Sequence, residues 1–191
     1  MKQIILASAS PRRTELLKQI GLNFEVVPSN ISEDIAETNA PADYAMNLSC
    51  RKAQDVAARS KNDCIIIGAD TIVVSERILG KPKDEKDAFE MLKMLRGKWH
   101  SVITGLTVID TLERKTVKCH ECTNVKIKNL SDDFIWSYIR TGEPFDKAGS
   151  YGIQGIGAVM VEKIEGCYFN VVGLPLARLT SILEEFGVKV L

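Results

Sequence analysis

Two arginines stand where a helix is expected to begin, in a turn that usually carries carboxylates. Residues 7–13 read Ala-Ser-Ala-Ser-Pro-Arg-Arg and follow a short apolar run that suits a buried strand. Ser10 is a natural N-cap and Pro11 fits the first helical position, so Arg12 and Arg13 fall in the first turn. Because a helix N-terminus is partly positive, these cations are unfavourable there unless an anion lies between them. With the free backbone N–H groups they predict a phosphate cradle; the alternative is two solvated arginines.

A single carboxylate, Asp70, interrupts a second apolar stretch. Residues 64–74 read Cys-Ile-Ile-Ile-Gly-Ala-Asp-Thr-Ile-Val-Val, which is typical of a central strand. A buried carboxylate without partners is costly, so Asp70 must be hydrogen-bonded, metal-bound or at the mouth of the strand. Gly68 and Ala69 would leave room beside it for a ligand. We interpret Asp70 as a metal ligand or general base at the carboxyl edge of the sheet; a structural aspartate that caps a turn is the alternative.

Two acidic residues, Glu33 and Asp34, follow the second predicted strand. Alone they are typical of a solvated acidic loop. If the first two strands neighbour the strand of Asp70, these carboxylates could help to hold Mg²⁺ opposite bound phosphates. Both interpretations remain open from the sequence.

Lysines and a glycine-dense segment supply further candidates. Lys52 lies in a predicted helix, whereas Lys81 and Lys147 lie in loops between small or rigid residues, where a side chain that reaches a phosphate would be placed. Each lysine taken singly fits a solvated surface equally well. Residues 146–157 are rich in glycine, which allows close approach of the backbone to a ligand. Within this segment Gln154 offers an amide that could read the edge of a base; a plain turn-rich loop is the alternative.

The overall charge restricts the class of partner. The 191 residues contain 25 Lys and Arg against 25 Asp and Glu, so the net charge is zero. Proteins that coat nucleic acid or anionic membranes usually carry a basic excess, so neither partner is expected. No apolar run approaches the ~18 residues of a membrane-spanning helix. The N-terminus leads directly into the first predicted strand without the apolar core of a signal peptide, so we expect a cytoplasmic protein.

The five cysteines are expected to be free thiols in a reducing compartment. Cys119 and Cys122 form a C-x-x-C pair, which can hold zinc or perform redox chemistry. No second pair follows, and the segment looks like a strand rather than a helix start, so we do not expect either use. His100 follows Trp99 at the start of a strand and is interpreted as structural.

Periodicity predicts a mixed α/β protein. The expected strands are 4–7, about 24–27, 64–74, 99–109, 116–127 and 158–164, and the expected helices are 11–20, 41–59, 85–95, 131–140 and 175–186. A glycine-rich loop spans 142–157. The long hairpin formed by 99–127 predicts an elongated mixed sheet with flanking helices and a central cleft between two lobes.

Five short motifs, in order and spread over nearly the whole chain, resemble those of the Maf family. They are Ala-Ser-Ala-Ser-Pro-Arg-Arg at 7–13, Gly-Ala-Asp-Thr at 68–71, Gly-Lys-Pro at 80–82, Asp-Lys-Ala-Gly-Ser-Tyr-Gly-Ile-Gln-Gly at 146–155 and Gly-Leu-Pro at 173–175. Members of this family are known as septum-formation inhibitors and nucleoside triphosphate pyrophosphatases. The resemblance implies one Maf-like domain over 1–191, with an α/β fold similar to the inosine triphosphate pyrophosphatases. It also implies Mg²⁺- or Mn²⁺-dependent hydrolysis of a nucleoside triphosphate to the monophosphate and pyrophosphate.

The same resemblance implies roles for individual residues. Asp70 matches the family's catalytic acid, described as a proton acceptor, and Glu33 matches an acidic position associated with the metal. The phosphate-contacting positions correspond to Ser8, Arg12, Arg13, Lys52 and Lys81, and the positions tied to substrate choice correspond to Arg12, Thr71 and Gln154. Gly-Ala-Asp-Thr and Gly-Ile-Gln-Gly are similar to the dTTP/UTP branch and differ from the 7-methyl-GTP branch.

We therefore expect a cytoplasmic hydrolase that acts on dTTP, UTP and related modified pyrimidine triphosphates. A nucleotide-sensing regulator of cell division is the alternative, although a pure triphosphate binder gains little from a carboxylate that faces phosphates. The expected partner is the nucleotide with its Mg²⁺ or Mn²⁺, and the sequence leaves open whether the protein is a monomer or a homodimer. Because the helix start is overcharged, reversing the charge of Arg13 is expected to leave stability unchanged or slightly raised.

Overall fold

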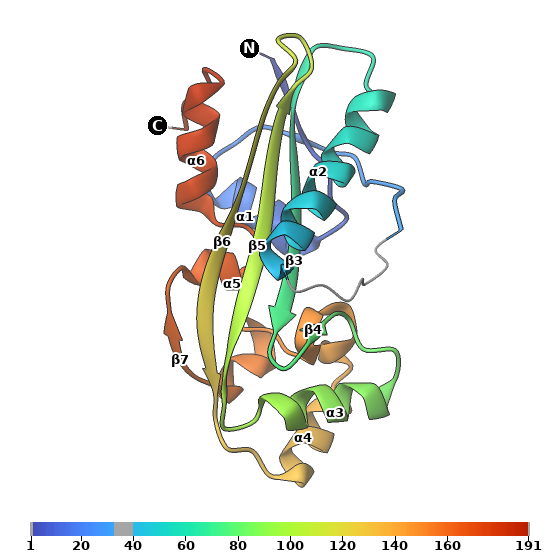
Figure 1. The fold of residues 1–191 in the computed structure, drawn as a ribbon, viewed down its shortest axis with the longest axis vertical. Helices are drawn as coiled ribbons and strands as arrows, with labels where there is room; N and C mark the ends of the chain where they lie inside the picture. The colour runs from blue at the N-terminus through green and yellow to red at the C-terminus, as the bar shows by residue number, and fades with distance from the viewer. Residues whose placement is uncertain (1, 33–39, 191) are drawn as a thin grey trace.

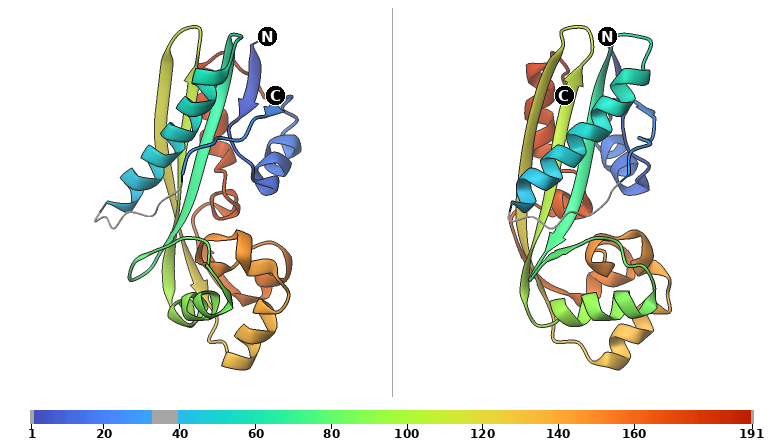
Figure 2. Two further views of the ribbon diagram at one scale, coloured as in Figure 1. Left: turned by 90° about the vertical axis from the view of Figure 1, so that its right-hand side faces the viewer. Right: turned by 45° about the vertical axis from the view of Figure 1, so that its right-hand side comes forward.

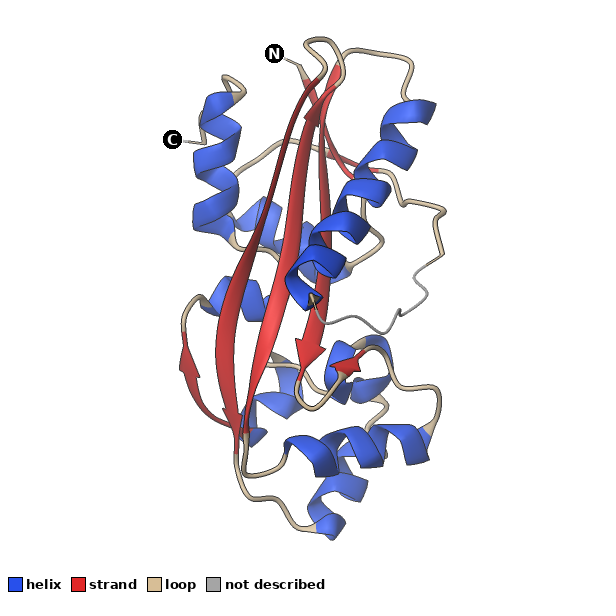
Figure 3. Cartoon of the chain, viewed as in Figure 1, coloured by secondary structure: helices blue, strands red, loops and turns tan. Residues whose placement is uncertain are grey.

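One mixed sheet forms the frame of the molecule, and the computed structural model describes residues 2–32 and 40–190 (Figures 1 and 3). In these residues the sheet has seven strands in the order β2-β1-β3-β5-β6-β7, with β4 beside β3. The strands are β1 Gln3–Leu6, β2 Glu25–Val26, β3 Cys64–Val74, β4 Ile78–Leu79, β5 Trp99–Asp110, β6 Lys115–Ile127 and β7 Val161–Glu165. β1 runs parallel to β2 and β3, and the other pairs are antiparallel.

Helices cover both faces of the upper half of this sheet (Figure 2). The helices are α1 Pro11–Gln19, α2 Pro41–Arg59, α3 Glu85–Leu95, α4 Asp132–Ile139, α5 Tyr168–Val172 and α6 Leu176–Glu185. α2 lies on one face, where its Ala53 packs against Ile66 of β3. α1 and α6 lie on the other face, where Leu17 and Leu183 share a core with Ile67. Successive residues of β3 therefore point into two different cores.

A second lobe is built around the open end of the β5–β6 hairpin, opposite the turn that connects the two strands. Its core contains Leu92 of α3, Ile135 of α4 and Tyr151, packed against Val102 and Val125 of the two strands. Short 3₁₀ helices at Glu143–Asp146, Ala148–Ser150 and Gly155–Met160 complete this lobe. The expected elongated sheet with two lobes is confirmed, because β5 and β6 are long enough to run through both.

The strand that carries Asp70 outruns its parallel neighbour. β1 ends at Leu6, which pairs with Ile67, whereas β3 continues to Val74. Asp70 thus lies beyond the carboxyl end of β1, at the edge where open α/β folds present their ligands. The strand order also places β1 between β2 and β3, and β2 runs parallel to β1, so the chain leaves β2 at the same edge.

Gly68 serves helix packing, which corrects the expectation that it leaves space for a ligand. A Cβ at this position would overlap the carbonyl oxygen of Ser49 and lie 2.8 Å from Cβ of Ala53. Gly105 on β5 is pressed in the same way against the backbone of Ala45. Both neighbours belong to α2, so the two glycines let this helix lie unusually close to the sheet. Ala69 points to the opposite face, where it is fully buried.

Local signals set most element boundaries. Ser131 accepts a hydrogen bond from the N–H of Phe134, which confirms the expected cap of α4. Ser10 lies at the N-cap of α1, but its hydroxyl makes no capping bond, contrary to expectation. β4, α5 and the three 3₁₀ helices were not predicted, because each is too short for its periodicity to be recognised. Among the described residues no helix is long and apolar enough to cross a bilayer.

Replacing Gly68 with alanine should displace α2 and cost about 1–3 kcal/mol of unfolding free energy, the usual penalty for overpacking. Urea unfolding measures this directly. Gln54→Ala, on the exposed side of α2, is the control and should change stability by less than about 0.5 kcal/mol. Wild-type stability for Gly68→Ala would mean that the close helix–sheet contact is not required.

Candidate active site

A cavity of about 440 Å³ lies between the two lobes. The start of α1, the middle of β3, the loop after β4 and the glycine-rich segment line it. Its lining includes most of the residues singled out from the sequence, namely Ser8, Arg12, Arg13, Asp70, Thr71, Lys81 and Gln154. Lys52 is not in the lining but contacts Asp70 directly. Glu33 lies outside the described residues.

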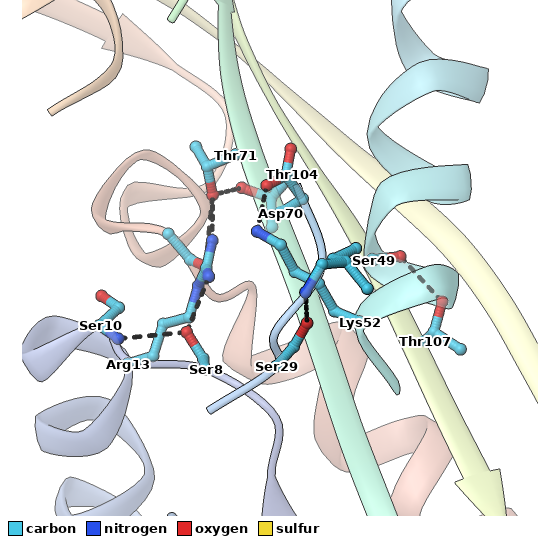
Figure 4. A network of polar contacts seen from close by, with 12 residues as sticks. Ser8, Ser10, Arg13, Ser29, Ser49, Lys52, Asp70, Thr71, Thr104 and Thr107 are labelled. Carbon is cyan, nitrogen blue, oxygen red and sulfur yellow. Dashed lines mark hydrogen bonds and ion pairs between the residues drawn. The ribbon is translucent and has the colours of Figure 1, made fainter. Parts of the chain in front are cut away.

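Asp70 and Lys52 form a buried ion pair on the face of β3 that α2 covers (Figure 4). Nζ of Lys52 donates to Oδ1 of Asp70 over 2.7 Å, and each residue is only 6% exposed. Because a lone charge at this depth would be strongly unfavourable, each residue makes burial of the other tolerable. Within the described residues this is the one hydrogen bond to the carboxylate, and Asp70 also lines the cavity.

Arg13 lies on the opposite side of the same strand and is tied into the protein (Figure 4). Its Nε donates to the carbonyl of Gly173 over 2.8 Å, Nη1 to Oγ of Ser8 over 3.0 Å and Nη2 to Oγ1 of Thr71 over 3.0 Å. The residue is 8% exposed. The positive charge of Arg13 at the start of α1 therefore does not depend on a bound anion alone, because acceptors within the protein bind its guanidinium. A structural role for Arg13 was missed because Gly173 lies far along the chain.

Hydroxyl groups extend this network through the sheet. Oγ1 of Thr71 lies 2.9 Å from Oγ1 of Thr104, which donates to the carbonyl of Asn170 over 3.1 Å. Ser8 accepts from the backbone N–H of Ser10 as well as from Arg13. Thr71 is thus held between Arg13 and β5, and its hydroxyl orientation depends on both. Nothing in the local sequence pointed to Thr104, a fully buried threonine within an apolar strand.

Arg12 has a carboxylate partner supplied by the protein. Its Nη1 donates to Oδ2 of Asp146 over 2.6 Å, so α1 is joined to the second lobe across the cavity. Burial acts to raise the pKa of Asp146, but Lys147 and Arg12 together hold it below its usual value. The side chain of Asp146 is 60% exposed. An exposed pair of this kind contributes at most about 1 kcal/mol, so Arg12 can exchange it for another anion at little cost.

The remaining predicted residues differ in how they are held. Lys81 is exposed at the cavity wall. Lys147 turns back into its own loop, where Nζ donates to the carbonyl of Glu143 and to Asp146, each over 2.7 Å. Gln154 is half-buried in the cavity wall, at the N-cap of the 3₁₀ helix Gly155–Met160. The cavity therefore has cations near α1 and β4 and an amide on the glycine-rich side.

The donor set fits a divalent cation only if a ligand contributes part of the coordination. Residues 2–32 and 40–190 contain no group of three or more His, Cys, Asp or Glu side chains placed to hold a metal. They do offer Asp70, a buried carboxylate that faces the cavity. Mg²⁺ is commonly bound by one or two carboxylates together with substrate phosphates and water. Asp70 is compatible with that mode, in which the protein supplies few ligands.

The other motifs have structural roles. Cys119 and Cys122 point to opposite faces of β6, so they cannot chelate one metal ion. All five cysteines lie in the described part of the chain and are free. Nε2 of His100 lies 2.7 Å from the hydroxyl of Tyr151, and burial lowers the pKa of His100 to about 4. A neutral, buried His100 that bonds Tyr151 is in keeping with the structural interpretation.

Comparison with known proteins identifies close relatives. Residues 3–186 match the protein family described as Maf-like protein. A dTTP/UTP pyrophosphatase from Acetivibrio thermocellus is 54% identical over 197 residues, covering 100% of this chain and 98% of the relative. A dTTP/UTP pyrophosphatase from Thermoanaerobacter sp. is 55% identical over 191 residues, covering 99% and 100%. The solved structure of a HAM1 protein from Coxiella burnetii superposes with a TM-score of 0.53 at 12% identity, covering 97% and 100%, a likeness of fold alone.

Arg13→Lys should lower the free energy of unfolding by about 2 kcal/mol, because an ammonium group cannot replace the planar fork that contacts three separate acceptors. Arg12→Lys is the matched control and should cost less than about 1 kcal/mol. Thermal or urea unfolding of the two ligand-free variants makes the comparison. Equal, small losses would restore the expectation from the sequence that Arg13 is not needed by the fold.

Proposed function

Because the chain belongs to the family of Maf-like proteins, we propose that it hydrolyses dTTP and UTP to the nucleoside monophosphate and pyrophosphate. The relatives from Acetivibrio thermocellus and Thermoanaerobacter sp. bear the name of that activity. The observation that carries the proposal is the buried Asp70–Lys52 pair at a cavity that arginines and a lysine also line. The whole chain, 1–191, acts as one domain in this proposal, since both lobes contribute to the cavity.

The triphosphate is proposed to lie across the start of α1. There the backbone N–H groups of the first turn and the positive end of the helix dipole favour an anion. Arg12 exchanges Asp146 for a phosphate oxygen, and Lys81 approaches from the loop after β4. Arg13 acts from behind this surface, since its guanidinium holds Ser8 and Thr71 in place. Phosphoryl transfer needs mainly positioning and charge stabilisation, which this arrangement provides.

Hydrolysis joins a water oxygen to the α-phosphorus and breaks the bond to the oxygen that bridges to the β-phosphate. The water loses a proton and pyrophosphate leaves. Asp70 is the carboxylate available for this step. Lys52 holds one of its oxygens, which fixes the orientation of the other toward the cavity. That second oxygen either accepts the proton of water or binds the cation.

A divalent cation, Mg²⁺ or Mn²⁺, would be held by Asp70 and the substrate phosphates, with Glu33 as a further proposed ligand. When bound, it neutralises phosphate charge and polarises the α-phosphate for attack. The same carboxylate argues against a role in nucleotide sensing alone, because burying a negative charge beside phosphates weakens binding unless a cation lies between them. Nucleic acid is not a proposed partner, since the net charge is zero.

Base selection is assigned to the glycine-rich side of the cavity. Uracil and thymine present an acceptor, an N–H donor and a second acceptor along one edge, and the amide of Gln154 can pair with two of these groups. Cytosine has an acceptor in place of the N–H and an amino donor in place of one carbonyl. Polar groups arranged for uracil would then face unmatched partners. Thr71, fixed by Arg13 and Thr104, lines the same cavity.

Asp70→Asn keeps the shape of the side chain and removes its charge, so turnover should fall by at least about 10²-fold. Pyrophosphate release from UTP is measured over a wide range of Mg²⁺ and Mn²⁺ concentrations. If the turnover of Asp70→Asn recovers at high metal concentration, Asp70 acts chiefly as a metal ligand. If it does not recover, Asp70 acts as the proton acceptor. Asp63→Asn, in the exposed loop before β3, should retain full activity. A folded Asp70→Asn protein with wild-type turnover would contradict the catalytic assignment.

Gln154→Ala should reduce the preference for UTP over CTP. In the wild type, UTP and dTTP are expected to react at similar rates and CTP about tenfold or more slower, since unpaired polar groups cost about 1–3 kcal/mol. The variant should lose more kcat/KM for UTP than for CTP. Gln19→Ala, exposed on α1, serves as the control. A wild-type preference for 7-methyl-GTP, or an unchanged UTP/CTP ratio in Gln154→Ala, would contradict this assignment.

A further inference from the structure

The carboxylate of Glu143 is the meeting point of three hydrogen-bond donors. Oε2 accepts from the backbone N–H of Ile156 over 2.8 Å. Oε1 accepts from the N–H of Gly157 and from the hydroxyl of Tyr138, both over 2.9 Å. Burial acts against the charge, but these three donors hold the pKa of Glu143 below its usual value. Glu143 is therefore an ionised, well-coordinated side chain that neither the phosphate site nor the ion pair of Asp70 uses.

The two N–H groups bound by Glu143 belong to the turn that presents Gln154. They begin the 3₁₀ helix Gly155–Met160, whose N-cap is Gln154. Gly155 has a φ of +68°, and a Cβ there would lie 2.7 Å from Oε2 of Glu143. A Cβ at Gly157 would lie 2.7 Å from the hydroxyl of Tyr138. The glycines let the backbone close around this carboxylate directly after Gln154.

The same segment also holds the partner of Arg12. The carbonyl of Glu143 accepts from Nζ of Lys147, which bonds Asp146, which in turn binds Arg12. The 3₁₀ helix Glu143–Asp146 thus binds the turn after Gln154 at one end and, at the other, places the carboxylate of Asp146 in the cavity wall against Arg12. Among the described residues, the side chain of Glu143 accepts hydrogen bonds from this turn and from Tyr138.

We propose that Glu143 is a positioning residue for nucleobase selection, whose carboxylate fixes the turn at 155–157 so that the amide of Gln154 faces the base. The proposal rests on the proposed function in one respect, that Gln154 reads the base. A carboxylate is required because both of its oxygens face donors. Glutamine in its place would set an NH₂ group against one of the backbone N–H groups and release that end of the turn.

Glu143→Gln is tested by measuring kcat and KM separately for UTP and CTP. We expect kcat/KM for UTP to fall about tenfold, the scale of one lost hydrogen bond to a charged acceptor. For CTP we expect less than about a twofold change, because CTP does not use the Gln154 contact. The ratio of kcat/KM for UTP to kcat/KM for CTP therefore falls, mostly because KM for UTP rises. An equal loss for both nucleotides, or an unchanged ratio, would overturn the proposal, since a purely structural role affects both substrates alike.

Two further variants sharpen the comparison. Tyr138→Phe removes the hydroxyl donor but leaves both backbone N–H bonds, so the UTP/CTP ratio should stay that of the wild type; a narrowed ratio would shift the role to Tyr138. Glu143→Asp keeps the charge with a shorter reach and should give an intermediate ratio, which also serves if Glu143→Gln does not fold. If both single variants, Glu143→Asp and Glu143→Gln, keep the wild-type UTP/CTP ratio, the proposal is wrong.

Gln154→Ala separates this inference from the proposed function. If Gln154→Ala narrows the UTP/CTP ratio and Glu143→Gln does not, only the role of Glu143 is wrong. If Gln154→Ala leaves the ratio unchanged, the base assignment itself fails, whatever the result for Glu143. The UTP/CTP ratio of the double variant should be no lower than that of Gln154→Ala alone, because both changes remove the same contact between Gln154 and the base.

Discussion

The buried ion pair between Lys52 and Asp70 is the constraint on which the rest of the site depends. It joins a helix to the middle of the sheet at a depth where either charge alone would be strongly unfavourable. The pair can form only because α2 lies close to β3 and β5, and glycines at 68 and 105 remove the side chains that would keep it away. The packing of α2 and the orientation of the Asp70 carboxylate are therefore linked, because one helix supplies both the close contact and Lys52.

The middle of β3 presents chemistry on both of its faces. Asp70 points toward α2, and Thr71 points toward α1 and α5, where it meets Arg13. Both residues line one cavity because β1 stops short and leaves this part of β3 at an edge. An extended strand that outruns its neighbour can thus place a charged pair and a hydroxyl network within reach of one ligand, which a fully paired strand could not do.

The second lobe supplies polar and charged side chains to the cavity wall. Glu143, Lys147 and Asp146 form one short polar unit that shapes the turn of Gln154 and meets Arg12 across the cavity. Contacts between exposed charges are individually weak, so the link between Asp146 and Arg12 can open at little cost in free energy. The carboxylate of Glu143 accepts three hydrogen bonds, two of them partly buried, so the turn after Gln154 is held more firmly than Arg12.

The sequence by itself determined the longer elements of this protein and the residue types available at its cavity. The apolar periodicity of 41–59, 64–74 and 85–95 is local, and the structure has helix, strand and helix at those positions. The isolated Asp70 and the arginines after Pro11 marked the residues that now line one cavity. Tertiary structure alone decided their partners: Arg13 meets Gly173, Arg12 meets Asp146, and Gly68 admits α2 rather than a ligand. These contacts join segments distant in sequence, and local patterns carry no information about which distant atoms folding brings together.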